Sequence, residues 1–72
     1  MREYLIHLRM KQNESQQSVA DSLGISRQYY SLIESGERQK NMDITLLSKL
    51  SDVFHIPLAE MVELERNNLQ TD

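Results

Sequence analysis

Apolar side chains recur along the chain at intervals of three and four residues, interrupted by short polar segments. Positions three and four apart lie on one face of a helix, so this spacing predicts helices rather than strands. The predicted helices cover residues 2–12, 16–23, 27–35, 44–54 and 57–66. Ser15, Ser26 and Asp43 are suited to begin helices as N-caps, and Gly24 and Gly36 are suited to end them. The predicted fold class is therefore all-α.

Residues 16–36 contain two short helices joined at Gly24. The first ends its apolar face at Leu23, and the second has Tyr30 and Ile33 on its inner face. Two helices joined by a tight, glycine-containing turn form a helix-turn-helix unit, whose second helix can enter the major groove of DNA.

The outward face of the second helix follows from a rotation of about 100° per residue. Gln28, Ser31 and Leu32 lie opposite the Tyr30–Ile33 direction, with Arg27 on one side. Gln pairs with adenine, Arg pairs with guanine, and an apolar side chain can contact a thymine methyl group. The alternatives are an ordinary solvated helix face and, for Leu32, an incidental exposed leucine.

Composition excludes several classes of function. The chain of 72 residues is one domain without cysteine, so it has no disulfide or thiolate metal site. His7 and His55 are isolated, and a domain this small has no room for a deep catalytic pocket. We expect no enzyme activity, metal, cofactor or small-molecule ligand. No apolar run is long enough for a membrane span, and no basic start followed by an apolar stretch suggests a signal peptide. We therefore expect a cytoplasmic protein without membrane contact.

The net charge of −3 is unusual for a DNA-binding protein, but the charge is unevenly distributed. Residues 1–40 carry six basic and five acidic side chains (+1), whereas residues 41–72 carry two basic and six acidic ones (−4). Attraction to phosphates depends on the charge of the protein face that meets the DNA, rather than on the net charge of the whole protein. Few basic side chains also mean weak binding by one copy, which predicts a homodimer whose second helices lie about 34 Å apart.

Residues 5–62 resemble the Cro/repressor-type, or XRE-like, helix-turn-helix domain. The matching elements are Leu5, Leu8-Arg9, Ser15-Gln16, Val19-Ala20, Leu23-Gly24, Ser26, Tyr29-Tyr30, Ile33-Glu34, Gly36, Leu47, Leu50, Phe54, Ile56-Pro57 and Met61. The resemblance implies a compact five-helix bundle of the phage-repressor type over residues 1–66, with residues 67–72 as a polar C-terminal tail.

The resemblance also implies roles for individual residues. Base edges would be contacted by Arg27, Gln28, Ser31 and Leu32. Phosphates would be contacted by Gln16, Ser26, Tyr29, Arg38 and Lys40. Tyr29 could instead pack beside the preceding helix. Arg9 and Glu34 would form a structural ion pair, with DNA contact as the alternative for Arg9.

The chain departs from the family pattern at four places. Glu14 occupies a position that is commonly apolar, and His55 a position where glycine is common. Residues 40–42 lack the usual proline, and Leu32 stands where a polar residue is frequent. The first three departures concern stability or loop shape, and the last concerns which DNA is bound.

Two sets of residues in the acidic half remain open to different interpretations. Leu46, Val53 and Leu64 are a tentative dimer interface; alternatively, the last helix covers the first two and Leu64 is merely exposed. Glu60, Glu63 and Glu65 form an acidic run that we expect on a solvated helix face, rather than as a contact for a polymerase subunit or a surface that repels DNA.

These observations predict a sequence-specific transcriptional regulator, a repressor or controller that binds a palindromic operator in double-stranded DNA as a dimer. The alternative is an antitoxin-type or other protein-interaction module that pairs with a partner protein through its acidic C-terminal half.

Overall fold

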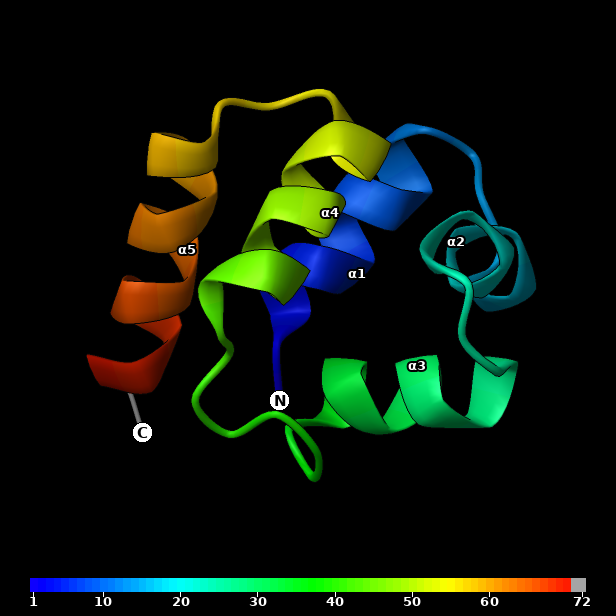
Figure 1. The fold of residues 1–72 in the computed structure, drawn as a ribbon, viewed down its shortest axis with the longest axis horizontal. Helices are drawn as coiled ribbons and strands as arrows, with labels where there is room; N and C mark the ends of the chain where they lie inside the picture. Colours follow the sequence, from blue (N-terminus) through cyan, green and yellow to red (C-terminus); the bar gives the residue numbers. More distant parts are fainter. Residues whose placement is uncertain (71–72) are drawn as a thin grey trace.

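The protein is described by a computed structural model over residues 1–70, with side chains over residues 1–68. Within this range the chain forms five helices and no strand (Figure 1). They are α1 (Glu3–Lys11), α2 (Gln16–Leu23), α3 (Arg27–Ser35), α4 (Ile44–Phe54) and α5 (Leu58–Gln70). The predicted all-α fold of five helices is confirmed.

The helix ends are determined by local chemistry. The side chains of Ser15, Ser26 and Asp43 each accept a hydrogen bond from the backbone N–H three residues further on, so each is an N-cap as predicted. Gly24 and Gly36 take left-handed conformations with φ values of 74° and 87°, which end α2 and α3. These ends fix the lengths of both helices in the helix-turn-helix unit.

Three residues with side chains also adopt left-handed conformations. Asn13, Gln39 and His55 have φ values of 56°, 56° and 57°. Asn tolerates this conformation, as predicted for the end of α1. His55 is the C-cap of α4, where the backbone is left-handed. Glycine adopts this conformation readily, which explains why glycine is common at this position in the family that the chain resembles. The chain is therefore strained at the end of α4.

The core lies where the helices meet. α2 packs against α3 and α4, α4 packs against α5, and α1 packs against α3. The buried apolar side chains are Leu5, Val19, Ala20, Leu23, Tyr30, Ile33, Leu47, Leu50, Phe54 and Met61. This core leaves α3 along one edge of the molecule and α5 on another side (Figure 1).

Helix α5 continues past Arg66, where we expected the helix to end, and reaches Gln70. Residues 67–70 contain neither glycine nor proline, so their polarity alone does not end the helix. The last two residues of the predicted tail, 71 and 72, lie outside the described residues. No helix in the described part of the chain is long and apolar enough to cross a membrane.

The prediction of a solvated acidic face on α5 is wrong at one position. Glu60 and Glu63 are exposed, but Glu65 is only 4% exposed. It forms an ion pair with Arg2, which is 2% exposed, at 2.9 Å between Oε1 and Nε. Glu65 follows Leu58 and Met61 by seven and four residues, so it lies on the inward stripe of α5 rather than outside it.

Candidate nucleic-acid interface

Helix α3 presents the side chains predicted to contact bases. Arg27 and Gln28 are exposed, while Ser31 and Leu32 are half-buried. The inner side of the helix carries Tyr30, Ile33 and Glu34, which are buried. Because the cap at Ser26 fixes the first turn, the exposed pair stands at the N-terminal end of α3. In such units, the N-terminal residues of the second helix contact base edges.

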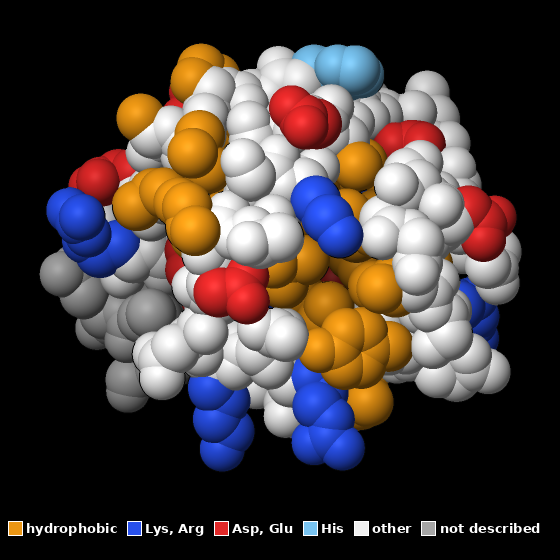
Figure 2. Space-filling view, viewed as in Figure 1, with side chains coloured by type: hydrophobic (Ala, Val, Ile, Leu, Met, Phe, Trp, Pro, Cys, Tyr) orange, Lys and Arg blue, Asp and Glu red, His pale blue; other side chains and the backbone are white. Residues whose placement is uncertain are grey.

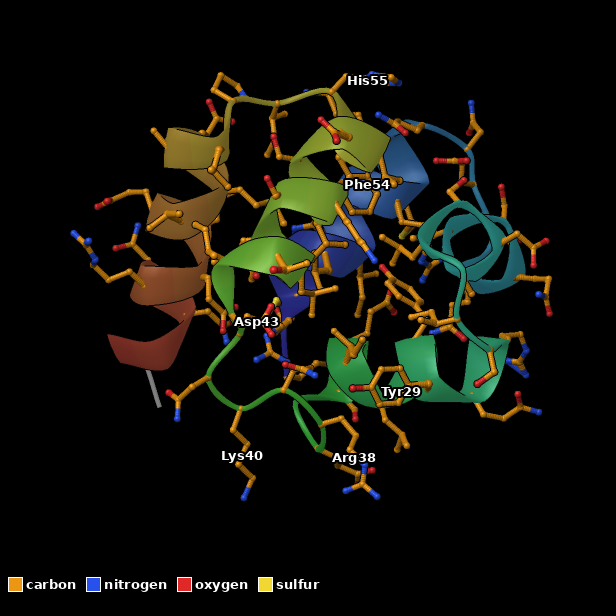
Figure 3. All side chains as sticks on the ribbon, in the orientation of Figure 1. Tyr29, Arg38, Lys40, Asp43, Phe54 and His55 are labelled. Carbon is orange, nitrogen blue, oxygen red and sulfur yellow. The ribbon has the colours of Figure 1, made fainter. Side chains whose placement is uncertain are left out.

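The loop between α3 and α4, residues 37–42, carries two exposed cations. Arg38 and Lys40 extend from this loop away from the body of the molecule, on the edge along which α3 runs (Figure 3). They are the two basic side chains at the lower edge in Figure 2. Glu37, in the same loop, is also exposed, so the loop carries a net charge of +1. The position suits contact with phosphates beside a groove that holds α3.

Glu34 connects three helices on the buried side of this interface. Its Oε2 accepts from Arg9 Nε of α1 at 2.8 Å, which is the ion pair implied by the resemblance. Its Oε1 accepts from Gln16 Nε2, at the start of α2, at 3.0 Å. Gln16 Oε1 in turn accepts from Arg27 Nη1 at 3.3 Å. The contacts therefore run from α1 through Glu34 and Gln16 to the exposed Arg27.

These contacts restrict what Gln16 can do. Its amide oxygen faces Arg27 and one N–H is donated to Glu34, which leaves its second N–H for another acceptor. A phosphate near the N-terminus of α2 is also favoured by the helix dipole. Phosphate contact by Gln16 thus stays a prediction, and Gln16 also accepts a hydrogen bond from Arg27.

Electrostatics keep the Arg9–Glu34 pair charged. Burial alone would raise the pKa of Glu34, but hydrogen bonds from Arg9 and Gln16 outweigh it and hold the pKa below its ordinary value. The hydrogen bond to Glu34 raises the pKa of Arg9. Tyr30 lies beside the pair, where burial and the Glu34 carboxylate raise its pKa. Its hydroxyl is buried without a hydrogen-bond partner among residues 1–68.

Tyr29 is half-buried and packs against the core. Its ring borders a shallow hollow of about 180 Å³, which Leu23 of α2 and Leu46 of α4 also line. Apolar side chains are visible in this hollow at the centre of Figure 2. The Tyr29 hydroxyl accepts from Gln39 Nε2 at 2.8 Å, which leaves its own proton for donation. Phosphate contact by Tyr29 stays a prediction.

The residues of the tentative dimer interface are all half-buried. Leu46 and Val53 pack against the core, and Leu64 lies on α5. Ile44, at the start of α4, is 60% exposed and is a further candidate for this interface. The location of the interface stays a prediction.

Glu14 is tolerated at its usually apolar position because it is half-buried and has polar partners. Its carboxylate accepts from Ser18 Oγ at 3.0 Å, and its backbone oxygen accepts from Arg9 Nη1 at 3.2 Å.

Two residues that matter for the loop were missed in the sequence. Arg2 contacts the backbone of residues 38 and 39 from inside, and Gln39 reaches Tyr29. The one available signal was a charged residue, Glu65, on the apolar stripe of α5, because such a position requires a buried partner. No group of acidic, histidine or cysteine side chains in the described range could hold a metal ion.

The chain matches the model of a known protein family. A family model described as Helix-turn-helix matches residues 5–61, which include α1 from its third residue, all of α2 to α4 and the first turn of α5. Comparisons with curated proteins and with solved structures give no significant match. The match covers α2, α3 and the loop that carries Arg38 and Lys40.

Proposed function

The chain belongs to the helix-turn-helix family of the XRE type, and from this premise we propose that it is a sequence-specific transcriptional regulator that binds a palindromic operator as a homodimer. Membership makes it a DNA-binding protein of the regulatory kind. The operator symmetry, the dimer, a role as repressor or controller and a cytoplasmic location are our proposals.

The observation that carries this proposal is the arrangement of polar groups around α3. Exposed Arg27 and Gln28 stand at its N-terminal end, and exposed Arg38 and Lys40 follow its C-terminal end. With α3 in the major groove, the first pair faces base edges and the second pair faces the sugar-phosphate backbone. Gln16, at the start of α2, provides a further donor for the backbone.

Specificity would come from few side chains. Gln28 makes bidentate hydrogen bonds with adenine, and Arg27 makes them with guanine. Leu32 packs on a thymine methyl group, and Ser31 hydrogen-bonds a neighbouring base. Because Gln16 holds the Arg27 guanidinium at 3.3 Å, Arg27 loses less conformational freedom on binding than a free side chain would.

The scarcity of positive charge supports a dimer. One copy offers Arg27, Arg38 and Lys40 on this side of a protein whose net charge is −3. Because each neutralised phosphate releases counterions, so few contacts give weak binding, and two copies on one DNA double their number. Leu46, Val53 and Leu64 on α4 and α5, with exposed Ile44, are the proposed interface.

Selection of bound fragments from a random DNA pool, at a fixed salt concentration, tests the proposal. We expect a palindromic consensus with half-sites one helical turn apart. Sedimentation of the free protein at tens of micromolar should show the dimer. A monomeric protein that selects no consensus would overturn the proposal.

A protein-interaction role of the antitoxin type is the second candidate. Glu60 and Glu63 are exposed on α5, away from the edge formed by α3. A basic partner could bind there while α3 remains accessible. Co-purification of a specific partner that is lost in a Glu60→Lys, Glu63→Lys variant would support this role, and retention of the partner would contradict it.

A further inference from the structure

The buried side chain of Arg2 lies directly behind the α3–α4 loop. Its Nε and Nη2 donate to the two carboxylate oxygens of Glu65 at 2.9 and 3.0 Å. Its Nη1 donates to the backbone oxygens of Ile33 at 2.6 Å and Arg38 at 3.2 Å, and Nη2 also donates to that of Gln39. A guanidinium group has five N–H donors, and all five of them are used here.

The loop conformation depends on these contacts. Gln39 has a left-handed backbone, which is unfavourable for a residue with a side chain. Its backbone oxygen is held by Arg2, and its side chain donates to the Tyr29 hydroxyl. With Gln39 held inward at both ends, its neighbours Arg38 and Lys40 extend outward (Figure 3). The contacts of Arg2 thus set the direction of the two exposed cations.

The Arg2–Glu65 pair is itself held in place by contacts with α1, α3 and α5. Glu65 of α5 also accepts from the Tyr4 hydroxyl of α1 at 2.6 Å. The backbone N–H of Arg2 donates to the backbone oxygen of Glu34, in α3, at 2.7 Å. The Arg2 guanidinium is therefore held from several sides. Through it, the α3–α4 loop is connected to α5 as well as to the two helices that it joins.

We propose that Arg2 and Glu65 are positioning residues for DNA binding, which hold the α3–α4 loop so that Arg38 and Lys40 meet phosphates together with α3. The inference rests on the proposed function of the loop. Stability alone does not require this pair, since well-packed apolar residues often replace a buried ion pair without loss. The forked geometry does require arginine, because a lysine ammonium has three donors and no planar fork.

A double-mutant cycle tests the inference. Affinity for the selected operator is measured by fluorescence anisotropy at fixed salt for four proteins: wild type, Arg2→Lys, the loop variant Arg38→Gln with Lys40→Gln, and the combination. If Arg2 acts through the loop, Arg2→Lys weakens binding about tenfold in the wild-type loop and less than about twofold in the loop variant. Equal losses in both backgrounds, or no loss in either, would overturn the inference.

The loop variant alone separates this inference from the proposed function. It should reduce the slope of log affinity against log salt by about 2 for each bound copy. An unchanged affinity and slope would overturn the phosphate role of the loop and the inference with it, whereas equal Arg2→Lys losses would overturn the inference alone.

Measurements without DNA show whether a variant binds less because it is unfolded. Thermal unfolding defines a temperature at which each variant is fully folded, and all binding is measured there. If Arg2→Lys does not fold, Glu65→Gln, which keeps the side-chain volume, replaces it in the cycle. In the folded variant, amide hydrogen exchange should accelerate at Arg38, whose N–H is bonded to Leu32, and remain unchanged in α2. Uniform acceleration would contradict a positioning role.

Discussion

The Gln16 amide donates to the Glu34 carboxylate at 3.0 Å, and this bond joins the start of α2 to the last turn of α3. The two helices of the DNA-binding unit are therefore joined through a charged group that is 4% exposed. Because Arg9 holds the same carboxylate, stability and DNA binding should respond together to changes at Glu34.

Glu34→Ala should lower the free energy of unfolding by about 3 kcal/mol, because it leaves Arg9 half-buried without its partner. Chemical denaturation measures this change. Glu63→Ala, which breaks the exposed pair with Arg66, is the matched control and should cost less than about 1 kcal/mol. An unchanged denaturation midpoint for Glu34→Ala would show that the pair is not structural.

The pH dependence of stability should report on the same carboxylate. The pKa of Glu34 lies below its ordinary value of 4.5 in the folded protein, so the unfolded state takes up a proton first as pH falls. The contribution of Glu34 is therefore complete above about pH 4.5 and is lost as the pH falls through the lower, folded pKa. Denaturation series between pH 7 and pH 3 should show a shallower decline for Glu34→Gln than for wild type. Parallel declines would contradict the assignment.

His55→Gly should stabilise the protein by about 1 kcal/mol, because glycine adopts the left-handed conformation at the end of α4 without steric cost. The midpoint of thermal unfolding measures this gain. Asn13→Gly is the matched control: Asn13 has nearly the same φ value, but Asn tolerates it better, so the gain should be smaller. A lower midpoint for His55→Gly would mean that the imidazole makes a compensating contact.

Gln28→Ala should relax the preference for one base pair in each half-site and weaken binding by about 1–3 kcal/mol. Lys40→Ala should instead weaken binding to all sequences and reduce the salt slope by about 1 for each bound copy. Repeated DNA selection and salt titrations distinguish these effects. Asn67→Ala, an exposed position on α5, is the control and should change neither property. Loss of preference with Lys40→Ala would contradict the division into base and phosphate contacts.

Sequence was sufficient where the determining interaction is local. Each N-cap binds a backbone group three residues away, so Ser26 and Asp43 could be assigned from their own neighbourhood. Arg2 could not be assigned in this way, because its partner Glu65 lies 63 positions further along the chain. Nor does any pattern show that Gln39 turns inward between two outward cations. The helices were thus predictable, but the contacts that orient the interface were not.

The separation of charge gives the protein an electric dipole. Arg38 and Lys40 lie at the edge along which α3 runs, whereas Glu60 and Glu63 are on α5. Beyond about 8 Å at physiological salt the net charge of −3 is largely screened from the phosphates, and closer to the duplex the nearest charges prevail. The phosphates therefore exert a torque that turns the loop toward the duplex and α5 away from it. Encounters in which the α3–α4 loop faces the DNA are therefore favoured before any base is contacted.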